Sequence, residues 1–118
     1  MTLDDLNAFC RSLPATTHVV QWGQSDVWKV GGKVFVVAGT QPDGHLSFSV
    51  KVTPMTFEIL RDHPDCRPAP YLASRSMSWI QYYTGHQMSD DELRGLIADS
   101  HRLVADGLSK KKQKELGL

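Results

Sequence analysis

Histidine and cysteine are the side chains in this sequence with the widest chemistry, since both bind metals and take part in proton transfer or nucleophilic attack. A zinc site needs several such ligands at the short spacings of one helix turn or one loop. The nearest arrangement is His63-Pro64-Asp65-Cys66, which places two potential ligands in a loop. We therefore predict no metal site and no cofactor. The histidines are scattered along the chain, at His18, His45, His63, His86 and His101.

Catalytic motifs are missing from the sequence as well. Gly31-Gly32-Lys33 lacks the four residues that separate the glycines of a phosphate-binding loop, and no serine lies in a nucleophile elbow. The paired carboxylates Asp4-Asp5 and Asp90-Asp91 lie in the first turns of predicted helices, where negative charge is favourable. The sequence therefore predicts a binding module rather than an enzyme.

Small polar and cationic side chains on the predicted strands are the strongest lead to a function. Ser47, Ser49 and Lys51 alternate with apolar residues, which predicts a strand with one buried and one solvated face. Hydroxyl and ammonium groups hold phosphate oxygens, and exposed aromatic rings stack on bases. The candidate nucleic-acid-binding residues are Lys29, Lys33, Ser47, Ser49, Lys51, Arg67 and Arg75, and the candidate stacking residues are Trp79, Tyr82 and Tyr83.

The same three aromatic residues support a second interpretation. If exposed, Trp79, Tyr82 and Tyr83 would form an apolar patch for a protein partner or for a second copy of the chain. The 13 basic and 13 acidic residues balance, so the whole chain has no preference for a polyanion. We take DNA binding with little base specificity as the leading hypothesis and protein interaction as the alternative.

Helices are predicted at both ends of the chain. Thr2 is a candidate N-cap for a helix that Pro14 ends, and Ser89-Asp90-Asp91-Glu92 is a capping box. Apolar residues then recur at helical spacing over Leu93–Leu108. A third, short helix is predicted to open at Thr53-Pro54, because Pro is favoured at the first helical position.

Between the N-terminal helix and the short helix at Thr53-Pro54, apolar residues recur at every second position, and turn residues interrupt the pattern at intervals. Strands are predicted at His18–Trp22 and Asp26–Val30, and Gly31-Gly32 forms a hairpin to the next strand. The unbroken apolar run Val34–Val37 predicts a central strand covered on both faces. A further extended stretch is expected after the prolines at 68 and 70. The fold class is α+β, with an antiparallel β-sheet packed against N-terminal and C-terminal helices.

Length and composition agree with this fold class. The 118 residues predict one domain over 1–118. Its end at about 109–118 is lysine-rich and contains four lysines and one glutamate. No apolar run approaches the roughly 20 residues that cross a bilayer, and the acidic start differs from a secretory signal. Cys10 and Cys66 lack a disulfide framework spacing. We expect a cytoplasmic protein that has no membrane partner.

Several local strings resemble the MmcQ/YjbR family, small bacterial proteins with a CyaY-like α+β fold. They are WKVGGKVF at 28–35, RPAPY at 67–71 with Trp79 after it, SDDEL at 89–93 and SHRLV at 100–104. The resemblance implies a DNA-binding protein whose β-hairpins project like paired wings, and no enzymatic activity. Carried onto this chain, it places Lys29 and Lys33 on one hairpin, with Lys51, Arg67 and Arg75 on or beside the sheet.

Overall fold

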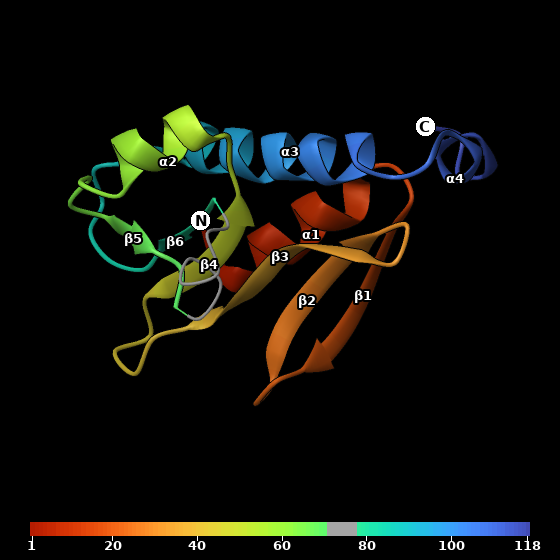
Figure 1. The fold of residues 1–118 in the computed structure, drawn as a ribbon. Helices are drawn as coiled ribbons and strands as arrows, with labels where there is room; N and C mark the ends of the chain where they lie inside the picture. The colour runs from red at the N-terminus through yellow and green to blue at the C-terminus, as the bar shows by residue number, and fades with distance from the viewer. Residues whose placement is uncertain (71–77) are drawn as a thin grey trace.

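The computed structural model describes residues 1–70 and 78–118, which form three helices on a six-stranded sheet and a fourth helix at the end of the chain (Figure 1). Capping boxes built on Thr2 and Ser89 open the first and third helices, and Thr53 caps the second. The predicted helix starts are therefore confirmed. The helices are α1 (Leu3–Ser12), α2 (Pro54–Leu60), α3 (Asp90–Asp106) and α4 (Lys110–Glu115).

The strands of the described residues pair antiparallel in the order β1-β2-β3-β4-β6-β5. Gly31 and Gly32 both have positive φ, as the tight hairpin between β2 and β3 requires. The α+β fold class is therefore confirmed, although residues 71–77 of the predicted extended stretch lie outside the described part. The strands are β1 (Thr16–Gln21), β2 (Ser25–Val30), β3 (Lys33–Thr40), β4 (Leu46–Lys51), β5 (Cys66–Pro68) and β6 (Trp79–Tyr82).

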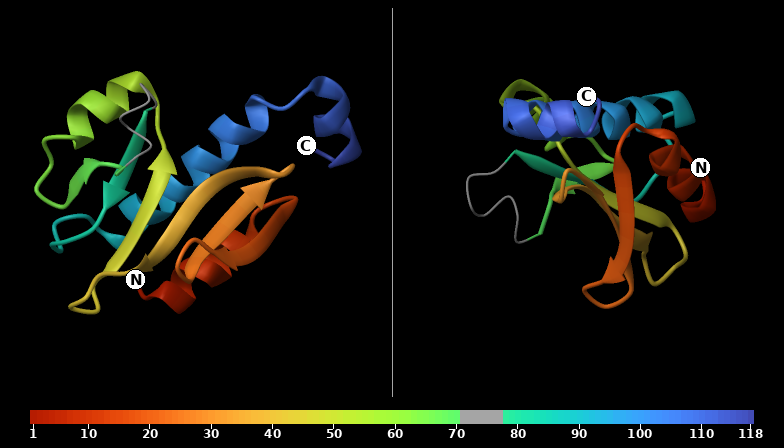
Figure 2. Two further views of the ribbon diagram at one scale, coloured as in Figure 1. Left: turned by 60° about the horizontal axis from the view of Figure 1, so that its bottom comes forward. Right: turned by 90° about the vertical axis from the view of Figure 1, so that its right-hand side faces the viewer.

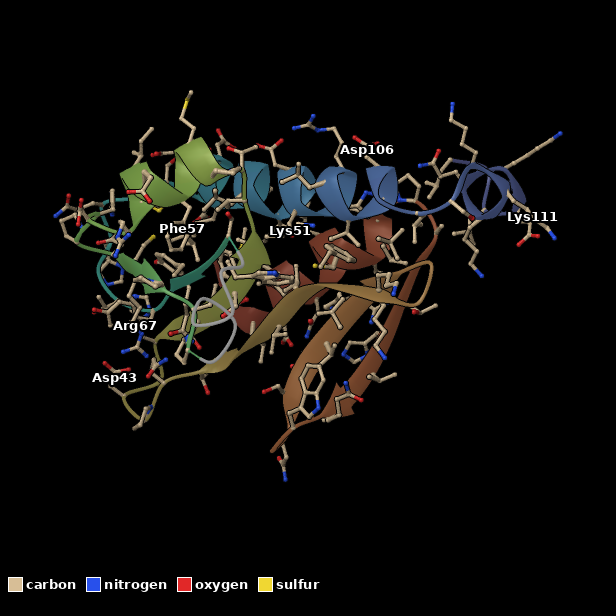
Figure 3. The ribbon with its side chains drawn as sticks, in the orientation of Figure 1. Asp43, Lys51, Phe57, Arg67, Asp106 and Lys111 are labelled. Carbon is tan, nitrogen blue, oxygen red and sulfur yellow. The ribbon has the colours of Figure 1, made fainter. Side chains whose placement is uncertain are left out.

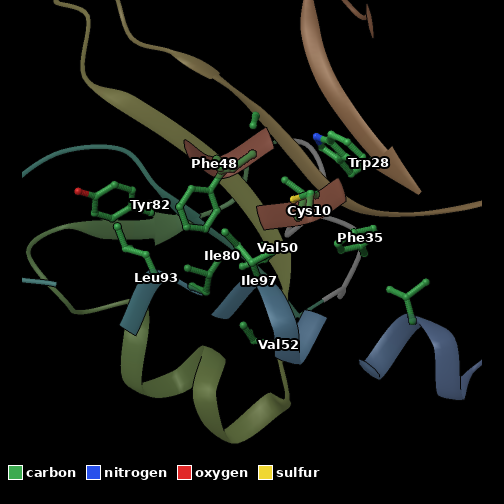
Figure 4. Close-up of a cluster of buried hydrophobic side chains, with 14 of the residues drawn as sticks. Cys10, Trp28, Phe35, Phe48, Val50, Val52, Ile80, Tyr82, Leu93 and Ile97 are labelled. Carbon is green, nitrogen blue, oxygen red and sulfur yellow. The ribbon is translucent and has the colours of Figure 1, made fainter. Parts of the chain in front are cut away.

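One face of the sheet, the core face, is covered by α1, α2 and α3, as the two views of Figure 2 show. Directly opposed residues of neighbouring strands lie on the same face, so the register defines which side chains point inward. Two rows of such partners form the centre of the core (Figure 4). They are Trp28, Val36, Val50 and Ile80, and Ala38, Phe48, Tyr82 and Cys66.

A β-bulge in β3 explains the apolar run in this strand. Lys29 pairs with Val34 and Trp28 with Val36, so Phe35 is an extra residue. Phe35 and Val36 are both buried in the core, whereas Val34 and Val37 are only partly covered. The prediction that this run is covered on both faces is therefore wrong.

Ser100 of α3 fastens the bulge to the end of β4. Its hydroxyl donates to the carbonyl oxygen of Phe35 at 2.7 Å and accepts the backbone N–H of Lys51 at 2.9 Å. The side chain is fully buried, so both bonds are shielded from water. The serine thereby fixes the position of α3 on the sheet and the position of the Lys51 backbone at the end of β4.

Asp65 holds the connection between β6 and α3. Its carboxylate is buried, and Oδ2 accepts the backbone N–H groups of Gln87 at 2.8 Å and Met88 at 3.0 Å. Gly85 has a φ of +73° and passes so close that a Cβ there would lie 2.0 Å from Asp65 Oδ1. The segment predicted as a surface loop at 63–66 therefore contains a buried carboxylate that accepts two backbone hydrogen bonds.

The lysine-rich end of the chain forms a helix of its own. The predicted helical face continued to Leu108, but α3 ends at Asp106 and Ser109 caps α4. The side chains of Leu108 and Leu116 lie against Gly31, which anchors α4 beside the β2–β3 hairpin. No helix of the described residues is both long and apolar enough to span a membrane.

Candidate functional site

The face of the sheet opposite the core, the outer face, collects most of the residues predicted to bind nucleic acid. The register places Lys29 opposite Val34, Lys51 opposite Trp79, and Arg67 opposite Gln81, all on this face. Side chains from β2, β4 and β5 that are far apart in the sequence therefore share one surface. Lys33 lies exposed at the hairpin that leads into it.

The two serines of β4 are not solvated as predicted. Ser47 and Ser49 point toward the outer face, but they are buried, with exposed fractions of 8% and 7%. The expectation of a solvated serine row is therefore wrong, and Lys51 at the end of the strand is the exposed member of the set. Alternation along β4 indicates which way the side chains point, but burial also depends on what lies above them.

Charge is strongly segregated in this molecule, although its net charge is zero. Helices α1, α2 and α3 carry eight carboxylates against three arginines, a formal charge of −5. The strands carry four cations against Asp26 alone, and Asp26 lies opposite Ala38 on the core side, where it pairs with His18. Helix α4 adds four lysines against one glutamate. In Figure 3, Lys51 lies between Arg67 toward one end of the molecule and Lys111 at the other.

A groove of about 410 Å³ is lined by outer-face side chains of β3, β4 and β6 and by the C-terminal end of α3, and we call it the outer-face groove. Its walls include the apolar side chains of Val34, Val37 and Val104. Two cations, Lys33 and Lys51, also line it, and neither forms a salt bridge with any residue that the structure describes. The groove therefore joins an apolar floor to unneutralised positive charge.

Trp22 is a groove residue that is not among the predicted site residues. It follows β1, keeps 63% of its surface exposed and lines the outer-face groove. Its φ is +52°, and Gly23 and Gln24 after it also have positive φ. A bulky residue rarely adopts this conformation, and such strain concentrates at functional sites. The available signal was a tryptophan next to a glycine in a predicted turn.

Two of the three predicted stacking residues are buried and not exposed. Trp79 and Tyr82 are each 5% exposed, so the expected exposed patch of Trp79, Tyr82 and Tyr83 is wrong. Tyr82 belongs to the core, and Tyr83 lies under the guanidinium of Arg67, whose carbon is 4.0 Å from the ring centre. Arg67 also donates to Gln81 Oε1 at 2.7 Å. This arginine is therefore already held in place by the sheet.

Trp79 stands out because it is buried while its indole N–H lacks a hydrogen-bond acceptor among the described residues. It lines the outer-face groove together with its cross-strand partner Lys51. Its indole Nε1 is shielded from solvent and has no hydrogen-bond partner among the described residues. By contrast, the indole of Trp28 donates to Asn7 Oδ1 at 2.8 Å. The groove wall thus contains an unused donor.

The family model described as YjbR matches residues 11–103, which include all six strands and most of α3. The chain belongs to the YjbR family. An Escherichia coli O157:H7 relative, described as uncharacterized protein YbdF, is 34% identical over 92 residues, covering 77% of this chain and 73% of its own. The family resemblance seen in the sequence is therefore confirmed.

Solved structures of similar proteins agree with this YjbR fold. Deinococcus radiodurans protein DR2400, described with a DUF419 domain, matches with a TM-score of 0.86 and 30% identity, over 99% of this chain and 88% of its own. A Pseudomonas syringae protein matches with a TM-score of 0.70 and 19% identity, over 87% of this chain and 98% of its own. The second likeness concerns the fold alone.

Two remaining predictions concern residues beyond the outer-face groove. Arg75 lies in the segment 71–77, outside the described residues. Within residues 1–70 and 78–118, no three His, Cys, Asp or Glu side chains come together as a metal site would require. Both cysteines are free and buried, and burial raises the pKa of Cys10 to about 12 and of Cys66 to about 11, with Asp65 also raising that of Cys66.

Proposed function

We propose that this YjbR-family protein is a non-catalytic nucleic-acid-binding module that holds phosphates on its outer face with little base specificity. The observation that carries the proposal is the segregation of charge. The outer-face positions of the described strands include Lys29, Lys51 and Arg67 and no carboxylate. Phosphate binding depends on such local positive potential and not on the net charge of the chain.

Helix α4 extends this positive surface. Leu108 and Leu116 anchor the helix beside the β2–β3 hairpin, where Lys33 is exposed. Four exposed lysines of α4 therefore lie in the same part of the molecule as Lys33. A polyanion that follows the outer face toward the hairpin would meet both groups, and each phosphate contact releases counterions from the nucleic acid.

The proposal is tested by fluorescence anisotropy with a labelled DNA duplex and a labelled single strand, each titrated at about 50 and about 200 mM salt. We expect binding that weakens by at least about tenfold over this range, because several phosphates are neutralised at once. Binding that does not depend on salt, or no binding at the lower salt concentration, would overturn the proposal.

Protein interaction remains the second candidate function, but on a different surface from the one first predicted. Strand β1 is an edge of the sheet, and Val19, Val20 and Trp22 at this edge are exposed. Exposed apolar edge strands accept a further strand from a partner. A concentration-dependent mass in analytical ultracentrifugation that is lost in Val20→Lys would support this alternative.

A further inference from the structure

The outer-face groove has the features of a site for one planar, anionic group. Its apolar walls come from Val34, Val37 and Val104, and two lysines that form no salt bridge with a described residue line it. Its volume of about 410 Å³ is in the range of small-ligand sites, which are lined by apolar side chains with a few placed polar groups. A phosphate surface alone would not require such a hollow.

Two tryptophans give the groove an aromatic character. Trp22 is mostly exposed and is held by a left-handed backbone, so its ring is available to a partner. Trp79 is buried in the wall and leaves its Nε1 donor without an acceptor among the described residues. A buried donor without an acceptor is costly, and an occupant that offers a carbonyl oxygen or ring nitrogen would relieve this cost.

We propose that the outer-face groove takes one unpaired nucleotide of a single-stranded nucleic acid. The base packs against Trp22 and the apolar wall and presents an acceptor toward Trp79, while its phosphate lies between Lys33 and Lys51. The inference rests on the proposed function and narrows it to single strands, since a base paired within a duplex cannot enter a hollow of this kind.

The position of the groove favours a strand over a free small molecule. The groove is open on its solvent side, and Lys29 and Arg67 lie on the same face. A nucleotide seated between Lys33 and Lys51 can therefore continue in a chain whose next phosphates meet further cations. Stacking on aromatic rings tolerates every base, so the arrangement predicts little sequence preference.

The test compares two single-stranded probes of about ten nucleotides that carry equal phosphate charge. One is oligothymidine, and the other has abasic sugars throughout. Base stacking contributes about 1–3 kcal/mol per base, so we expect oligothymidine to bind at least about fivefold more tightly than the abasic strand. The variant Trp22→Ala should reduce this preference to nearly none, whereas Met55→Ala, which removes another exposed large apolar side chain, on α2, should leave it unchanged.

Nuclear magnetic resonance of the indole N–H groups gives a second readout. Oligothymidine should shift the Trp22 and Trp79 signals, while the Trp28 signal stays in place because its N–H is bonded to Asn7 beneath the sheet. Equal, salt-dependent binding of both probes without these shifts would overturn the groove inference and leave phosphate binding intact. Absence of binding to either probe would overturn both proposals.

Discussion

Lys51 and Trp79 are direct partners across the β4–β6 ladder, and they line the outer-face groove together. They also border a second hollow of about 370 Å³ on the side of Thr53 and Pro54. One cation and one buried donor therefore stand side by side between two cavities. Because both residues line both cavities, substitutions of this pair test what the outer face binds.

Exchanging Lys51 for glutamate should weaken binding of single-stranded DNA by at least about tenfold and lower the slope of log affinity against log salt by about one. The side chain is exposed, so the folded structure should remain intact. Arg102→Glu on α3 makes the same change in charge away from the outer face and serves as the control. An equal loss in both variants would mean that general charge, and not this surface, determines binding.

Gly85→Ala should destabilise the protein by about 2 kcal/mol or more. A left-handed backbone costs a non-glycine residue about 1–2 kcal/mol, and the new methyl group would also displace the Asp65 carboxylate. Gly95→Ala is the matched control, because Gly95 lies in α3 with open space around it. That variant should gain about 0.5–1 kcal/mol. Urea unfolding measures both, and an unaltered midpoint for Gly85→Ala would contradict the close packing of Gly85 against the Asp65 carboxylate.

Ser100→Ala should cost about 2 kcal/mol in the free energy of unfolding, since the carbonyl of Phe35 and the N–H of Lys51 both lose a buried partner. Ser12→Ala removes a hydroxyl from the exposed end of α1 and should change stability by less than about 0.5 kcal/mol. If Ser100→Ala also weakens DNA binding at temperatures where it is folded, the serine positions Lys51 as well as α3.

Stability should fall in alkaline solution because of Cys10. Burial raises the pKa of this thiol to about 12 in the folded protein, against 9.0 for an ordinary thiol. The unfolded chain therefore loses its proton first, so the contribution is constant below pH 9 and is lost as the pH rises toward 12. Between pH 9 and about 10.5, wild type should lose about 1–2 kcal/mol more than Cys10→Ala in urea titrations. Parallel pH profiles would contradict this assignment.

Features set by a few neighbouring residues could be predicted from the sequence. The Thr2, Thr53 and Ser89 caps and the Gly31-Gly32 hairpin follow from local hydrogen bonding and from φ > 0. The antiparallel strands and the terminal helices followed from periodicity. These local signals are sufficient to predict the α+β class without knowledge of any contact between distant residues.

The candidate site was less predictable because it depends on contacts between distant segments. The bulge at Phe35 requires knowledge of how β2 pairs with β3, and the burial of Ser47 and Ser49 depends on other parts of the chain. The sequence predicts Trp22 as the last residue of a strand, because residue type alone does not indicate its left-handed backbone. Periodicity shows which way a side chain points but not how much of it is covered.

The separation of charge between the helices and the outer face gives the molecule a large electric dipole without a net charge. Near neutral pH it should therefore be retained by both cation- and anion-exchange columns at low salt, each resin contacting a different side. In solution, the electric field of a polyanion would orient the approaching protein so that its outer face points toward the polyanion. An isoelectric point close to 7.0 conceals this directional attraction.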